Sequence, residues 1–323
     1  MRERRRDPVP FVALTLGDPA GIGPEVSLAA LADERVGESM RLVVLGPGRF
    51  RPADVPAVDE GALDAALRVA WLDTGVEGEW TVGRPQASAG RAALRALRQG
   101  AELASEGLVD ALVTAPVSKE ALHLAGEEVE GQTELLARWA EVDRIQMLAV
   151  ARRLRVALAT RHLPLRRALE EITTERVVDH LQRLDSGLRS FGFAAPRLAL
   201  AGLNPHAGES GLLGSEEAEI LAPAVTRARD KGLDVTGPES PDTVFLRASE
   251  GAYDAVLALY HDQAFIPIKL HAPGEALTVL LGLPYLRVSP AHGTAFDIAG
   301  RGVADPANLI CALLQAADWA KRR

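Results

Sequence analysis

Three of the seven histidines follow directly after apolar, β-prone runs of sequence. They are His162, after VALATR, His206, after LALAGLNP, and His261, after AVLALY. Neutral imidazoles that leave a coordination position open form a catalytic type of site for Zn²⁺, Co²⁺, Ni²⁺ or Mn²⁺. Histidines also serve as hydrogen-bonding caps at strand ends, so the spacing alone leaves both interpretations open.

Two further segments stand where anions often bind. Residues 17–25 follow a strand and open a helix, as a phosphate loop would, although they match neither G-x-G-x-x-G nor the Walker pattern. A tight structural turn is the alternative for this segment. Lys119 stands just inside a helix start after another strand, where it either neutralises an anion or is merely solvated.

Polar residues also interrupt apolar sequence at two other places. Gln132 and Thr133 precede a helix beginning near Leu135, and an ordinary N-cap by Thr133 is the local alternative to ligand binding. Arg287 and the polar segment 289–294 break an otherwise apolar stretch. This interruption indicates buried polar contacts with a ligand or a subunit.

The composition limits the class of protein. The length of 323 residues exceeds the roughly 250–300 at which single cores split, so we expect two domains. A single cysteine, Cys311, excludes an intramolecular disulfide framework and cysteine-rich metal sites, and its apolar surroundings predict a packing role. The net charge of −8 argues against non-specific nucleic-acid binding. No signal-type segment follows residues 1–6 and no apolar run is membrane-length, so we expect a cytoplasmic protein.

The elements that must position these residues alternate between β-prone and amphipathic helical runs, which is the pattern of a parallel α/β sheet. The expected strands are residues 11–16, 41–45, 111–114, 145–150, 155–160, 197–203 and 255–260, with 145–150 and 155–160 forming a hairpin or neighbouring pair. The expected helices are residues 25–32, 88–106, 174–188, 215–231 and 306–321. The carboxyl ends of parallel strands meet at one edge, so the three histidines belong at such an edge.

Seven blocks in this order resemble the 4-hydroxythreonine-4-phosphate dehydrogenase family. They are LTLGDPAGIGPE (14–25), TAPVSKEAL (114–122), GQTELLA (131–137), ATRHLPL (159–165), LNPHAGESGLLGSEE (203–217), YDAVLALYHDQ (253–263) and LGLPYLRVSPAHGTAFDIAGRG (281–302). The resemblance implies two α/β/α domains like those of isocitrate and isopropylmalate dehydrogenases, with an interdomain active-site cleft. It divides the chain into residues 1–133 plus 275–323, on the cofactor side, and residues 134–274, with the metal histidines and dimer contacts.

The resemblance also assigns roles to individual residues. It implies a homodimer in which His162, His206 and His261, drawn from both subunits, bind a divalent metal such as zinc, magnesium, cobalt or manganese. The cofactor is NAD, with NADP as the alternative. The substrate-binding residues are Gln132, Thr133, Lys269, Thr278 and Arg287; the cofactor-binding residues are Ser289, His292, Gly293 and Thr294; and the catalytic candidates are Lys269, Asp262 and Lys119.

The implied reaction is metal-assisted oxidation of 4-phosphohydroxy-L-threonine by NAD, followed by loss of CO₂ to give 3-amino-2-oxopropyl phosphate in pyridoxal 5′-phosphate synthesis. The chain departs from the family pattern at Gln132, Ala264, Thr278 and Ala291, where the family usually has His, Gly, Asn and Asp. These departures leave open a related dehydrogenase acting on a four-carbon sugar-acid phosphate or a diene-diol carboxylate. An inactive metal- or ligand-binding relative is a further alternative.

Overall fold

A computed structural model describes residues 9–63, 67–76 and 78–323 of the chain. The chain forms two compact units, Met1–Arg144 with Leu283–Arg322, and Ile145–Gly282. The unit boundaries thus follow Arg144 and Gly282, rather than residues 133 and 274. Helix α5 (Gln132–Trp139) packs on helix α3 (Ala87–Ser105) of the first unit. Strand β11 (Leu277–Leu281) pairs with strand β6 (Gln146–Ala151) of the second unit, and these contacts account for both boundaries.

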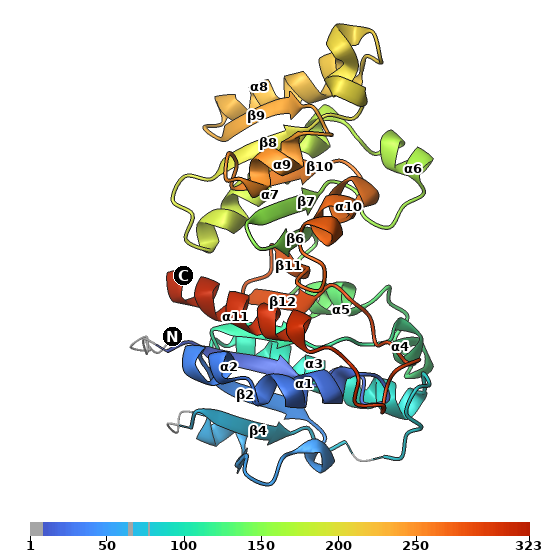
Figure 1. Ribbon diagram of the computed structural model, residues 1–323, viewed down its shortest axis with the longest axis vertical. Helices are drawn as coiled ribbons and strands as arrows, with labels where there is room; N and C mark the ends of the chain where they lie inside the picture. Colours follow the sequence, from blue (N-terminus) through green and yellow to red (C-terminus); the bar gives the residue numbers. More distant parts are fainter. Residues whose placement is uncertain (1–8, 64–66, 77) are drawn as a thin grey trace. The chain divides into compact units, whose positions relative to one another are not determined.

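The first unit is an α/β/α sandwich around a parallel sheet (Figure 1). Its strands lie in the order β3-β4-β2-β1-β5-β12, with every pair parallel. Helices α1, α2 and α11 pack together on one face, and α3 covers the other face at β1, β2 and β5. The elements are β1 (Phe11–Thr15), α1 (Gly23–Leu31), α2 (Glu34–Ser39), β2 (Arg41–Gly46), β3 (Ala57–Val58), β4 (Val69–Asp73), α3 (Ala87–Ser105), β5 (Ala111–Thr114), α4 (Lys119–Leu124), α5 (Gln132–Trp139), β12 (Leu286–Pro290) and α11 (Ala307–Arg322), with short 3₁₀ turns at Gly48–Phe50 and Glu60–Ala62.

The second unit repeats this layering around a mixed sheet. Its strand order is β11-β6-β7-β10-β8-β9, in which β6 runs antiparallel to both of its neighbours and β7, β10, β8 and β9 are mutually parallel. The elements are β6 (Gln146–Ala151), β7 (Leu154–Leu158), α6 (Leu165–Glu170), α7 (Thr174–Ser190), β8 (Arg197–Ala201), a 3₁₀ segment (Pro205–Gly211), a π turn (Glu217–Leu221), α8 (Ala222–Asp230), β9 (Asp234–Glu239), α9 (Val244–Ser249), β10 (Ala255–Ala258), α10 (His261–His271) and β11 (Leu277–Leu281).

The two-unit α/β fold predicted from the sequence is confirmed, and so are the seven predicted strands to within a few residues. The central strands are apolar on both faces and fully buried, as in β1 and β5, because helices cover both sides of each sheet. Cys311 is half-buried rather than packed away, although Ile310 and Ala312 beside it are buried. Among the described helices, none combines the length and the apolar character needed to cross a membrane.

Candidate active site

The three histidines singled out by the sequence stand at one edge of the second sheet. His162 follows β7, His206 follows β8 and His261 begins α10 directly after β10. Strand β10 pairs in parallel with β7 on one side and β8 on the other, so the carboxyl ends of the three strands are neighbours. The predicted position at the carboxyl ends of parallel strands is confirmed.

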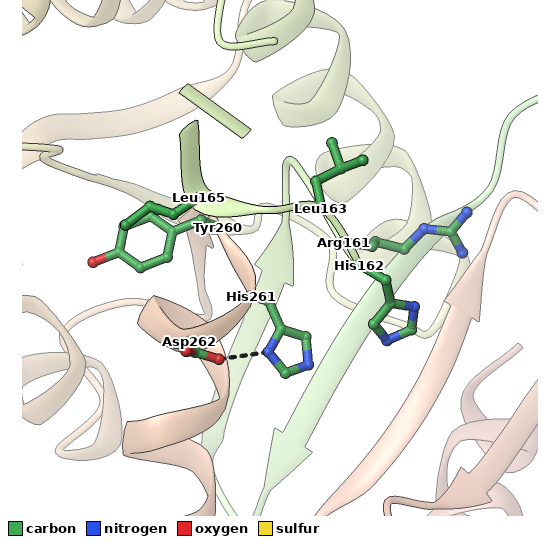
Figure 2. A pocket seen from close by; sticks show the side chains of 7 residues that line it. All are labelled: Arg161, His162, Leu163, Leu165, Tyr260, His261 and Asp262. Atoms are coloured by element: carbon green, nitrogen blue, oxygen red, sulfur yellow. Dashed lines mark hydrogen bonds and ion pairs between the residues drawn. The ribbon is translucent and has the colours of Figure 1, made fainter. Parts of the chain in front are cut away.

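Two of these histidines face each other. The ring centroids of His162 and His261 are 5.5 Å apart, and Figure 2 shows both rings pointing into one pocket. Asp262 Oδ1 lies 2.7 Å from His261 Nδ1, so the carboxylate accepts the Nδ1 proton and leaves Nε2 as a free ligand atom. The pocket has a volume of about 240 Å³ and is lined by Arg161, His162, Leu163, Leu165, Tyr260, His261 and Asp262.

His206 lies apart from this pair. It lines a separate hollow with Ala207, Glu209 and Ser210, on a backbone run in the left-handed region. Within the described residues, no three His, Cys, Asp or Glu side chains converge as a ready metal site. One chain therefore brings together two of the three predicted ligands, and their neutral nitrogen donors suit a divalent transition metal that gains another ligand elsewhere.

Lys269 shares a helix face with His261. The ring of Phe265 stacks on His261 with centroids 4.7 Å apart, and Lys269 Nζ lies 5.9 Å from the same Phe265 ring. The spacing of four and eight residues places all three on one side of α10. Thr278 is buried in β11, opposite Ala149 of β6.

Arg287, on β12 of the first unit, is a buried cation whose hydrogen-bond acceptors are neutral. Its side chain is 3% exposed, and its Nη2 donates to Thr114 Oγ1 at 2.6 Å and to Gln132 Oε1 at 3.4 Å. Burial lowers the pKa of Arg287 to about 10, against the opposing influence of Tyr285 and Glu134. Both hydrogen-bond acceptors of this guanidinium are uncharged, so an anionic ligand would meet a cation that the described chain has not neutralised through hydrogen bonds.

Gln132 and Lys119 both lie near the carboxyl end of β5 in the first unit. Gln132 Nε2 donates to Ala115 O at 3.1 Å, and the amide therefore links the exit of β5 to Arg287. The cap by Thr133 is wrong, since α5 begins at Gln132 with Gly131 in the N-cap position, and no side chain caps it. Lys119 is exposed at the start of α4, and its Cε would lie 3.7 Å from a Cβ on Gly131.

The predicted cofactor residues lie at the end of β12 and directly after it. Ser289 and Thr294 are buried, while His292 and Gly293 form the turn between them, with His292 Nδ1 3.0 Å from Gly293 O. Thr294 O accepts a hydrogen bond from Ile22 N at 3.0 Å. The Gly-rich loop 17–25 and the segment after β12 are therefore packed against each other.

Close packing explains one of the glycines in that loop. A Cβ on Gly21 would lie 2.9 Å from both Thr294 O and Thr294 Cβ, so no other residue type fits there without displacing the segment. Glu25, on α1, reaches the same segment: its carboxylate accepts hydrogen bonds from the backbone N–H groups of Gly300 and Gly302. The contacts join residues 275 and 277 positions apart in the chain.

Four carboxylate or amide side chains that hold these loops were not identified from the sequence. Asp18 is fully buried and accepts from Ala20 N at 2.9 Å; burial raises its pKa despite hydrogen bonds from Ala20 and Ser118. Glu25, Glu217 and Gln263 likewise accept or donate to loop backbone. All four lie within the blocks 14–25, 203–217 and 253–263, so the motifs contained them, but only long-range contacts reveal what they bind.

Comparison with known proteins places the chain in a family. The family model described as "Pyridoxal phosphate biosynthetic protein PdxA" matches residues 29–316. The chain is 42% identical to a 4-hydroxythreonine-4-phosphate dehydrogenase of Geobacter metallireducens, over 97% of this chain and 96% of the relative. It is also 42% identical to a D-threonate 4-phosphate dehydrogenase of Salmonella typhimurium, over 91% of this chain and 94% of that relative.

A solved structure agrees with these matches. The crystal structure of 4-hydroxythreonine-4-phosphate dehydrogenase from Klebsiella pneumoniae superposes with a TM-score of 0.88 at 39% identity, covering 96% of this chain and 99% of that one. Family model, sequence relatives and fold thus extend over nearly the whole chain. The chain belongs to the family of the pyridoxal phosphate biosynthetic protein PdxA.

Proposed function

We propose that this chain is an NAD-dependent 4-hydroxythreonine-4-phosphate dehydrogenase. The C3 hydride of 4-phosphohydroxy-L-threonine passes to NAD while a base takes the proton of the C3 hydroxyl. The resulting β-keto acid loses CO₂ from C1, and C2 takes up a proton to give 3-amino-2-oxopropyl phosphate, in the cytoplasmic synthesis of pyridoxal 5′-phosphate. Family membership and the names of relatives at about 40% identity support the reaction class. The single observation in this chain that supports the proposal most is the burial of Arg287 with only neutral hydrogen-bond acceptors.

Arg287 supplies the positive charge that a phosphorylated substrate needs. Its guanidinium is buried against the neutral side chains of Thr114 and Gln132, in a protein whose net charge is −8. A guanidinium binds phosphate or carboxylate oxygens through paired N–H groups, and burial strengthens that bond. Gln132, Thr133 and Thr278 complete the proposed substrate contacts without adding charge, while Lys269 adds a second cation.

The cofactor site is proposed at the end of β12 and the segment that follows it. Ser289, His292, Gly293 and Thr294 would contact NAD, and NADP is the alternative. The support is the packing of the loop 17–25 on this segment, which brings the start of α1 and its backbone N–H groups beside Thr294. A helix start of this kind favours the pyrophosphate of a dinucleotide.

The metal site is proposed at His162, His206 and His261. When bound, a divalent ion such as zinc, magnesium, cobalt or manganese would supply Lewis-acid chemistry that stabilises negative charge on the substrate oxygen. The chain's own contribution is orientation: Asp262 accepts the Nδ1 proton of His261 and fixes which nitrogen faces the pocket. Asp262, Lys269 and Lys119 are the candidates for proton transfer.

A homodimer would complete this metal site. A single chain brings His162 and His261 together and leaves His206 in a separate hollow, so the third ligand would come from a second copy. Large apolar side chains are exposed on the same unit, as expected of a surface that another subunit covers. They include Leu163, Leu165, Leu169, Leu212, Ile266 and Leu270.

D-threonate 4-phosphate is the second candidate substrate. A relative named for that activity is as similar to this chain, at 42% identity, as one named for the threonine compound. Gln132 stands where the family usually has a histidine, and it accepts a hydrogen bond from Arg287. Because Gln132 is uncharged, this change affects how the site would bind the anionic groups of the substrate. Both substrates carry the phosphate that Arg287 or Lys269 would bind, and they differ at C2.

Initial rates of NAD reduction would test the proposal. Purified protein is given Mg²⁺, Co²⁺ or Zn²⁺, or EDTA, together with 4-phosphohydroxy-L-threonine, D-threonate 4-phosphate or their unphosphorylated forms. We expect metal-dependent turnover of the phosphorylated amino acid with the highest kcat/KM. Turnover of D-threonate 4-phosphate alone would establish the second candidate, and activity only with unphosphorylated acids would exclude both.

A further inference from the structure

Glu217 is a buried carboxylate that holds the chain just before His206. Glu217 is only 7% exposed. Glu217 Oε1 accepts hydrogen bonds from the backbone N–H groups of Leu203, at 2.8 Å, and Asn204, at 2.7 Å. Its other oxygen, Oε2, accepts from Asn204 Nδ2 at 2.8 Å. One carboxylate therefore receives three donors from two consecutive residues of the loop.

The loop is also fixed where it leaves the sheet. Gln263 Oε1 accepts from Leu259 N at 2.7 Å, and Gln263 Nε2 donates to Gly202 O at 2.7 Å. This buried amide ties the end of β10 to the end of β8, the two strands that precede His261 and His206. The residues from Gly202 to Asn204 are thus held at both ends before the chain reaches His206.

The backbone around His206 has an unusual conformation that needs such support. Residues 206–210 all have positive φ, between 46° and 81°, and only Gly208 among them is a glycine. Left-handed conformation is unfavourable for residues with a Cβ and persists where the surroundings impose it. Gly208 rests on the same carboxylate, since a Cβ there would lie 2.9 Å from Glu217 Oε2.

We propose that Glu217 is a positioning residue, which sets the direction in which His206 presents its imidazole to a metal ion. The inference rests on the proposed metal-binding function of His206. An ionised carboxylate is suited to this task because it only accepts hydrogen bonds, and all three of its partners are N–H donors. Burial raises the pKa of Glu217, but the hydrogen bonds from Asn204 and Leu203 outweigh it, and the pKa is lowered overall.

The adjacent Glu216 provides a matched control. Its Oε2 also accepts from Asn204 Nδ2, at 2.8 Å, but no backbone N–H of the loop donates to it. Calorimetric titration of the full-length, metal-free protein with Co²⁺ then compares Glu217→Gln with Glu216→Gln. We expect Glu217→Gln to weaken Co²⁺ binding by roughly 10–100-fold, as is usual for a residue that orients a ligand. Glu216→Gln should bind Co²⁺ like the wild type.

A double-mutant cycle with His206→Ala separates positioning from a general loss of structure. If Glu217 acts through His206, adding Glu217→Gln to His206→Ala should cause no further loss of Co²⁺ affinity. Losses that add in full would overturn the inference, because they would place the effect elsewhere. Equal Co²⁺ affinity of wild type and Glu217→Gln would also overturn it.

Amide hydrogen exchange gives a readout that needs no metal. In the metal-free protein the amides of Leu203 and Asn204 should exchange faster in Glu217→Gln than in wild type or Glu216→Gln. Unchanged exchange would show that Glu217 does not hold the loop. If the wild type fails to bind Co²⁺, or His206→Ala binds it normally, the proposed metal site itself fails and the positioning role fails with it.

Discussion

The substrate-binding role proposed for Arg287 implies a cost to the stability of the ligand-free protein, because the guanidinium is buried without a charged hydrogen-bond partner. Replacing a buried cation whose acceptors are neutral by Met should remove a desolvation cost, because Met fills similar space without a charge. We expect Arg287→Met to lower kcat/KM by roughly 100-fold, about 3 kcal/mol. In the same variant, the Tm of the ligand-free protein should rise by roughly 2–4 °C.

Steady-state kinetics and calorimetric melting of the same preparations check this prediction. Arg91→Met, an exposed arginine on α3, is the control and should alter neither quantity. A lower Tm in Arg287→Met with unchanged kcat/KM would mean that Arg287 serves the fold rather than the substrate.

Because partial burial disfavours the charged form of His180, on α7, we expect the free energy of unfolding of the protein to fall in acid. Burial, followed by the charge of Arg183, lowers the pKa of His180 to about 4 from the ordinary 6.5, so the folded protein holds it neutral where the unfolded chain protonates it. Stability from this residue is present above pH 6.5 and is lost as the pH falls toward 4, by at most roughly 1.4 kcal/mol per pH unit.

Urea unfolding between pH 4.5 and 7.5 measures this slope. His180→Leu should flatten it, since Leu does not bind protons in the unfolded chain. Gln182→Leu, at an exposed position on the same helix, should leave the slope as in wild type, because neither Gln nor Leu titrates. Identical pH dependence of wild type and His180→Leu would contradict the assignment.

Among the elements, α1 holds the segment that follows β12 in place through the side chain of Glu25. Glu25 accepts from Gly300 N and Gly302 N, and an amide at this position has only one acceptor oxygen for two donors. Glu25→Gln should therefore loosen the segment and raise the KM for NAD by roughly tenfold. The KM for the phosphorylated substrate and the kcat should change less.

The exposed Glu34, on α2, gives the matched control, and Glu34→Gln should leave the KM for NAD unchanged. Initial rates over a range of NAD concentrations decide the matter. If Glu25→Gln changes the two KM values equally, Glu25 does not act specifically on the cofactor segment.

The elements also show how far the sequence could predict the fold. Buried strands such as β1 and β5 were predictable because they are short apolar runs bounded by turn residues. The helix expected at residues 215–231 is present, but its first part, Glu217–Leu221, is a π-helix that continues directly into α8. Pro223 lacks a backbone N–H and interrupts the regular hydrogen bonding there.

Helix α10 and the loop contacts were harder to foresee. Pro267 lies inside α10 and its apolar residues form no clear stripe, so local periodicity does not indicate a helix. The histidines could be placed at strand ends because that position depends on local sequence. The contacts of Glu217 and Gln263 could not, because they span 13 and 61 residues of chain.

For the whole molecule, the proposed second copy is the feature most open to test. The change Leu169→Asp with Leu212→Asp places two charges among the exposed apolar side chains that a second copy would cover, away from the pocket of His162 and His261. Light scattering should show a mass near the 34.4 kDa of one chain instead of twice that value. Co²⁺ binding should weaken in parallel, because His206 of a second copy is no longer present.

Leu246→Asp, an exposed leucine on α9, is the control and should keep the mass and the Co²⁺ affinity of the wild type. A wild type that is monomeric and still binds Co²⁺ through His162, His206 and His261 would contradict the shared site.

The second unit is one uninterrupted stretch of chain, Ile145–Gly282. Its first strand along the chain, β6, pairs with its last strand, β11, so that Gln146 lies opposite Leu281. On the ribosome this stretch can finish its sheet once residue 281 has emerged, whereas the first unit still lacks β12 and α11. The growing polypeptide therefore acquires its three histidines before it acquires Arg287 and the segment after β12. Synthesis interrupted in the last forty or so residues would leave the histidine edge of the sheet without the rest of the proposed site.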